Sequence, residues 1–128
     1  MPAMNPGGTL ILTATSTGVG NAFRIPKNAD NVTFQAVQIG TSEAATISST
    51  TKIEVSNDGV NWLTTICTDM VITGDSPASG GLAAGVALPA GQHWEYVRAK
   101  ASGYGATTAA STGALSSLNV YASATYRS

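Results

Sequence analysis

Few side chains in this sequence could do chemistry. The chain has 128 residues with one cysteine, one histidine and seven carboxylates, whereas covalent catalysis needs a nucleophile, a base and a group that orients them. A dyad of Cys67 and His93 is arithmetically possible. However, His93 lies at the entrance of an expected strand, which is typical of a partly exposed polar residue, and Cys67 follows Ile66 as a half-buried thiol would. We therefore expect no enzyme.

The carboxylates and glycines suggest no cofactor or metal site. Glu54 and Glu95 alternate with their strand neighbours, as solvated carboxylates do, and a glycosidase pair would also need a groove lined by aromatic rings. Asn57-Asp58-Gly59 contains a fragment of a calcium loop, but no bidentate glutamate follows at the required distance. Gly18-Val19-Gly20 lacks the third glycine and the following helix of a dinucleotide fingerprint. We expect neither a metal nor a cofactor.

Four aromatic residues are candidates for an interface or a ligand platform: Trp62, Trp94, Tyr96 and Tyr104. A tryptophan just after a hairpin is more often a core or interface anchor than a sugar platform. Sugar stacking remains the alternative interpretation of these rings.

The stretch from Lys52 to Ile66 predicts a β-hairpin. Apolar and polar residues alternate before the turn, as in a strand with one buried face. Asn57 and Asp58 suit a type I turn, and Gly59 can take a positive φ, which together make a three-residue hairpin with a G1 bulge. We expect residues 52–56 and 61–66 to pair antiparallel, with Gly59 at positive φ.

The rest of the chain is also typical of strands. They are expected at 9–15, 22–25, 32–39, 70–73, 93–101 and 115–126. At Val37 and Ile39 the apolar alternation changes parity, which indicates a bulge or burial on both faces. Residues 43–51 are rich in threonine and serine, and an extended segment anchored by Ile47 is expected there rather than a helix.

Two uncharged stretches interrupt this pattern and are expected to be long loops, at 76–91 and 102–113. In the first, Leu82, Val86 and Leu88 favour packing against the protein. The spacing of strands and turns predicts an all-β fold: a single antiparallel β-sandwich or jelly-roll-like domain over residues 9–128, preceded by a flexible N-terminal arm at 1–8.

Charge is scarce throughout the sequence. Only 10% of the residues are charged and the formal net charge is -1, well below the roughly 25% charged residues of ordinary soluble domains. A surface so poor in charge favours a place inside an assembly. The six basic residues are scattered, so nucleic-acid binding is not expected. There is also no transmembrane run or signal peptide, so we expect no membrane association and synthesis in a cytoplasm.

Two segments together carry a resemblance to known families. Residues 53–62 (IEVSNDGVNW) and 96–100 (YVRAK) resemble small β-sandwich proteins of tailed-phage virions, including head decoration and cement proteins. The same segments resemble the discoidin-type jelly roll, although the terminal cysteine pair and the aromatic loop spikes of that family are missing. The first resemblance implies a structural protein on the capsid exterior, made in the host cytoplasm. It would decorate or cement the capsid as a homo-oligomer, a dimer or trimer, with the major capsid protein or other virion proteins as partners. The alternatives are a carbohydrate-binding module and a tail or neck component.

Overall fold

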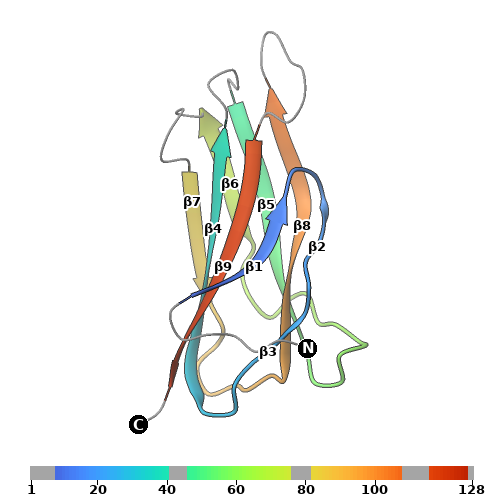
Figure 1. Cartoon of the computed structure of the whole chain (residues 1–128), viewed down its shortest axis with the longest axis vertical. Helices are drawn as coiled ribbons and strands as arrows, with labels where there is room; N and C mark the ends of the chain where they lie inside the picture. Colours follow the sequence, from blue (N-terminus) through green and yellow to red (C-terminus); the bar gives the residue numbers. More distant parts are fainter. Residues whose placement is uncertain (1–7, 41–45, 76–81, 108–115, 127–128) are drawn as a thin grey trace.

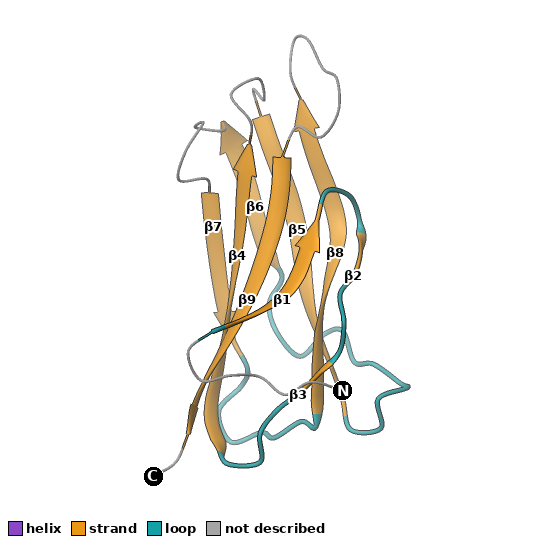
Figure 2. Ribbon diagram, viewed as in Figure 1, coloured by secondary structure: helices purple, strands orange, loops and turns teal. Residues whose placement is uncertain are grey.

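The structure is a computed structural model that describes residues 8–40, 46–75, 82–107 and 116–126. These residues form nine strands and no helix (Figures 1 and 2). The expected flexible arm lies outside the described residues, apart from Gly8. The strands are β1 (Thr9–Ala14), β2 (Gly18–Val19), β3 (Phe23–Arg24), β4 (Ala29–Gly40), β5 (Thr46–Ser56), β6 (Met70–Asp75), β7 (Leu82–Ala87), β8 (Tyr96–Thr107) and β9 (Ser116–Tyr126).

The strands form two antiparallel sheets that pack face to face. One sheet has the order β1-β9-β4-β7, and the other has the order β2-β8-β5-β6 with β3 also paired to β8. Figure 1 shows the long strands β4, β9, β5 and β8 running along the length of the molecule. The predicted all-β sandwich is therefore confirmed.

The core between the sheets comes from alternating positions of the long strands. In β9, for example, Leu118, Val120, Ala122 and Ala124 are buried, and in β8 the buried side chains are Val97, Ala99 and Ala101. Side chains with a period of two on both sheets fill a layer about 10 Å thick. Five of the described residues in this buried core are alanines: Ala36, Ala99, Ala101, Ala122 and Ala124.

The chain closes the sandwich along one side between β1 and β2. Gly20, just after β2, donates its backbone N–H to the carbonyl oxygen of Ala99 at 2.8 Å. A Cβ at this glycine would lie 2.5 Å from the carbonyl oxygen of Ile11 in the other sheet. Only a residue without a side chain allows the two backbones to come this close. On the opposite side β6 lies beside β7.

The two stretches expected to be long loops contain strand instead. β7 occupies Leu82–Ala87 within the first, and β8 continues to Thr107 within the second. Leu82 and Val86 pack against the core and Leu88 is buried, so the expected packing of this stretch is confirmed. The sequence pattern did not predict these strands because they are rich in small uncharged residues, which have a low β-propensity. Such residues still form strands where a neighbouring strand pairs with them.

The expected bulge or double burial at Val37 and Ile39 is wrong. β4 keeps an even register with β9 from Asn31 to Gly40. The buried position between the two apolar residues belongs to Gln38, whose Nε2 donates to the carbonyl oxygen of Gly105 at 3.3 Å. A polar amide can be buried at this position because it is hydrogen-bonded. Val37 and Ile39 therefore face outward.

The return strand at 61–66 is reduced to one antiparallel bridge, between Val55 and Leu63. Ile66 packs against the core, whereas Trp62 lies against Arg98 on the outer face of the sheet. The segment therefore passes from one face of the sheet to the other instead of continuing as a paired strand. The strand expected from residue 93 begins at Tyr96. Trp94 lies before the strand, so the alternation of strand side chains does not apply to it, and it packs against the core. No described segment forms a helix that could cross a membrane.

Candidate functional site

The turn at Asn57, Asp58 and Gly59 is held by its own hydrogen bonds. The buried Ser56 hydroxyl accepts from the N–H of Gly59 at 2.9 Å and donates to Asp58 Oδ1 at 2.8 Å. Gly59 has a φ of 74°, which confirms the predicted positive φ. Asn57 Oδ1 accepts from the N–H of Glu95 at 3.0 Å, which ties the turn to the start of β8. These bonds account for the residues of the turn without an ion.

Asp58 is a strong acceptor in this turn. The backbone N–H of Asn61 and that of Val60 donate to Asp58 Oδ1 at 2.8 and 2.9 Å, and the Asn61 side chain donates to Oδ2 at 2.8 Å. These donors, with the Ser56 hydroxyl, hold the pKa of Asp58 far below its ordinary value of 3.8. Donors to the charged form favour it over the neutral acid.

We expect Asp58→Asn to lower the melting temperature more at pH 7 than at pH 2. Because the pKa of Asp58 is depressed in the folded state, its stabilising effect is present above pH 3.8 and is lost as the pH falls toward the folded-state pKa. Thermal denaturation of both proteins at the two pH values measures the difference. Asp30→Asn controls for removing an exposed carboxylate. An equal loss at both pH values would contradict the role of the charge.

Glu54 is buried, not solvated as its alternation predicted. It lies on the outer face of β5, opposite Arg98 of β8, yet only 3% of it is exposed. Arg98 Nε donates to Glu54 Oε1 at 2.7 Å, and the Arg98 guanidinium lies 4.2 Å from the centroid of the Trp62 ring. The segment after the hairpin turn thus places a ring against the guanidinium of this ion pair.

The four candidate aromatic platforms do not form one surface. One ring face of Trp62 is covered by Arg98, and Arg24 lies 5.8 Å from the ring centroid of Tyr96. Trp94 and Tyr104 are partly buried against the core. Tyr96 is the first residue of β8, and Tyr104 lies eight residues further along the strand, a distance of about 26 Å at the usual rise. Each of the four rings is therefore partly covered within the chain.

Cys67 and His93, considered above as a dyad, each contact a different group. Cys67 Sγ lies 3.6 Å from the carbonyl oxygen of Ala87, and burial raises the pKa of this half-buried thiol. His93 is exposed, with Nε2 at 3.9 Å from Glu95 Oε1. Within the described ranges, no three His, Cys, Asp or Glu side chains are grouped so that they could hold a metal ion.

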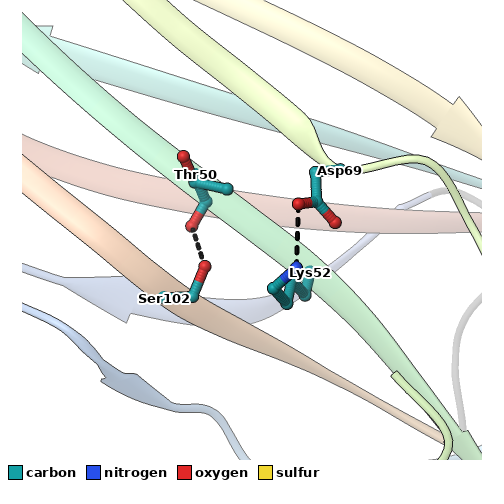
Figure 3. A network of polar contacts seen from close by, with 4 residues as sticks. All are labelled: Thr50, Lys52, Asp69 and Ser102. Carbon is teal, nitrogen blue, oxygen red and sulfur yellow. Dashed lines mark hydrogen bonds and ion pairs between the residues drawn. The ribbon is translucent and has the colours of Figure 1, made fainter. Parts of the chain in front are cut away.

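The outer face of the β2-β8-β5-β6 sheet is the charged face, defined by Lys52, Glu54, Arg98 and Lys100. Lys52 Nζ donates to Asp69 Oδ2 at 2.8 Å, and beside it the Ser102 hydroxyl donates to the carbonyl oxygen of Thr50 at 3.2 Å (Figure 3). These contacts join β5 to β8 and to the segment before β6. The charges of this face are partly paired within the chain.

Apart from Asp30, at the register shift near the start of β4, the described residues on the outer face of the other sheet are uncharged. The uncharged face is defined by these outward residues of its central part: Leu10, Thr13, Thr33, Gln35, Val37, Ile39, Ala83, Gly85, Ala87, Asn119, Tyr121 and Ser123. Leu10 is 48% exposed, Tyr121 39% and Ile39 37%. A shallow hollow beside Tyr121 is lined by residues of β4, β9 and Gly8. This face is the candidate functional site.

Sequence reasoning missed this face, although a signal was present. The segments of β1, β7 and β9 contain no charged residue, and β4 contains only Asp30. A sheet face that meets water usually shows polar and charged residues alternating with the core positions. Here Leu10, Val37, Ile39 and Tyr121 occupy positions of the outward set, and only the strand order shows that they share one face.

Comparisons with known proteins identify no family. No family profile matches the chain, and no curated protein sequence matches it. The chain is similar in structure to the SPBc2 prophage-derived protein YomS, with a TM-score of 0.45 and 16% identity over 91% of each chain. It is also similar to the K1 cleaved adhesin domain of Lys-gingipain from Porphyromonas gingivalis W83, with a TM-score of 0.47, 16% identity and 86% of this chain covered. The chain spans 62% of that adhesin domain. Similarity at these levels identifies no function.

Proposed function

We propose that the protein is a non-enzymatic structural component of a phage particle, which decorates or cements the capsid as a small homo-oligomer. Its partners would be the major capsid protein or other virion proteins, on the capsid exterior. The observation that carries this proposal is the uncharged face, a whole sheet surface with exposed Leu10, Tyr121 and Ile39. The sequence resemblance of residues 53–62 and 96–100 to virion β-sandwich proteins supports it.

An uncharged face favours assembly on energetic grounds. Burying a charge in an interface costs free energy unless it is paired and hydrogen-bonded. Hydroxyl and amide groups lose little if they find hydrogen-bond partners there, and apolar groups gain on leaving water. A free domain usually keeps charge on its surface to stay apart from its neighbours. Among the described charged residues, Lys52, Glu54, Arg98 and Lys100 lie on the charged face, and the others lie in turns or near the ends of strands. One face is thus suited to contact and the other to solvent.

Binding to particles tests the proposed function. Phage particles that lack this protein are prepared from a phage that encodes it. The labelled full chain is mixed with these particles, and the bound fraction is measured by sedimentation. We expect saturable binding that changes little between about 50 and 500 mM salt, because salt screens only charged contacts and only 10% of the residues are charged. Absence of binding, or a steep loss with salt, would contradict the proposal. The position of the added density in electron micrographs would distinguish a capsid site from a neck or tail site.

A further inference from the structure

We infer that the uncharged face packs against the same face of a second copy of this chain, in a two-fold symmetric dimer. This inference rests on the assembly role proposed above. It assigns the uncharged face to the contact between two copies, which leaves the rest of the dimer surface for contact with other virion proteins. In such a dimer each residue meets a residue of the same surface. The argument has three parts: the chemistry of the face, its relief and its area.

The chemistry of the face is compatible with itself. Near a two-fold axis a lysine or glutamate would meet a like charge. Hydroxyl and amide groups both donate and accept hydrogen bonds, so Gln35, Asn119 and Tyr121 can pair with groups of their own kind. Thr13 already donates to Asn119 Oδ1 at 3.1 Å across neighbouring strands. A protein partner of opposite charge has nothing to recognise here, which favours a second copy.

The relief of the face is self-complementary. One row of paired residues crosses all four strands, in the order Leu10, Tyr121, Gln35 and Gly85. The β1-β9 half of this row is raised by two large exposed side chains. The β7 edge is low, because its outward residues are Ala83, Gly85 and Ala87. β4, between β9 and β7, carries Gln35 and the exposed Ile39.

The relief selects the direction of the symmetry axis. A two-fold axis that lies between the two faces and runs along the strands places the β1-β9 half of one copy over the β4-β7 half of the other. Leu10 then meets Gly85 of the second copy, and Tyr121 meets Gln35 of the second copy. An axis across the strands through this row would instead place Leu10 against Leu10 and Tyr121 against Tyr121 of the second copy, and would leave the two low β7 edges apart. Close packing therefore favours the first arrangement.

The area of the face matches what a dimer needs only if the whole face takes part. The four strands cover roughly 550 Å² in projection at their usual rise and spacing. A standard interface buries about 800 Å² of accessible surface on each partner, and the accessible area of a corrugated face exceeds its projection. A change near the middle of the face should therefore have a large effect.

Sedimentation of the full chain tests the dimer, with Tyr121→Lys as the disrupting variant. Each dimer carries the change twice, so we expect the dissociation constant to rise by about 100-fold or more. The matched control is Val71→Lys, which places a lysine at an exposed apolar position of β6, on the other sheet. Thermal denaturation of both variants checks that the fold is intact. A wild-type chain that stays monomeric up to about 0.5 mM would overturn the inference, and so would equal effects of the two variants.

Cross-linking tests the direction of the axis. In a Cys67→Ser background, Leu10→Cys and Ala87→Cys chains are mixed and treated with a short bis-maleimide, because the spacing of packed sheets is too wide for a disulfide. The inferred axis brings Leu10 of one copy near Ala87 of the other. It separates the two Leu10 positions by about 14 Å across the strands. Cross-linked dimer should form in the mixture and not with Leu10→Cys alone, and the reverse pattern would overturn the arrangement.

The two proposals can fail separately. A wild-type dimer that never binds particles would leave the dimer standing and contradict the proposed function. A wild-type monomer whose particle binding is lost in Tyr121→Lys and kept in Val71→Lys would overturn the dimer and support the function, because the uncharged face would then dock directly on a virion protein.

Discussion

Arg98→Ala is expected to lower the free energy of unfolding by about 2–4 kcal/mol. The change removes the partner of Glu54, a carboxylate that is 3% exposed and accepts from Arg98 Nε at 2.7 Å. Removing one member of a buried ion pair leaves the other charge without water and without a partner. The side chain of Arg98 is itself 27% exposed, so water partly replaces it and the expected loss lies below that of a fully buried pair. Trp62 also loses the guanidinium that packs on its ring.

Urea denaturation of matched variants measures this effect. Lys100→Ala removes a cation two residues further along the same face of β8, and it should change the free energy by less than about 0.5 kcal/mol. The double variant Glu54→Ala, Arg98→Ala should lose less than the sum of the two single variants, because the single changes each leave one partner behind. Equal losses in Arg98→Ala and Lys100→Ala would mean that the pair adds no stability.

Gly20→Ala is expected to lower the free energy of unfolding by about 2–3 kcal/mol. The added Cβ would lie 2.5 Å from the carbonyl oxygen of Ile11 and 3.2 Å from Leu12 Cδ1. The first of these atoms belongs to the backbone of β1, so relief requires a movement of one sheet edge away from the other. The hydrogen bond from Gly20 N–H to the Ala99 carbonyl would be strained by the same movement.

Gly18→Ala is the matched control for this prediction. Gly18 lies two residues earlier, in β2, and a Cβ there meets nothing within 4 Å. Its backbone is outside the positive-φ region, so alanine should leave the stability nearly unchanged or raise it slightly by restricting the unfolded chain. Equal denaturation midpoints for Gly20→Ala and Gly18→Ala would show that the close approach of the two edges is not required.

The sequence by itself determined the fold class and the hairpin turn. Alternation of apolar residues over 115–126 predicts one buried face, and Leu118, Val120, Ala122 and Ala124 are indeed buried. The turn could be predicted because its causes are local: Gly59 can take a positive φ without a Cβ clash, and Asp58 accepts from neighbours two and three residues away. Local patterns of this kind do not depend on the rest of the chain.

Only the tertiary structure decided which residues share a surface. Glu54 looks solvated in the sequence, and it is buried because Arg98, from a strand far along the chain, pairs with it under Trp62. The uncharged face is likewise assembled from four strands whose order β1-β9-β4-β7 cannot be read from alternation. Alternation gives the two sides of each strand, whereas neighbouring strands are set by long-range pairing. The row from Leu10 through Tyr121 and Gln35 to Gly85 therefore exists only in the folded sheet.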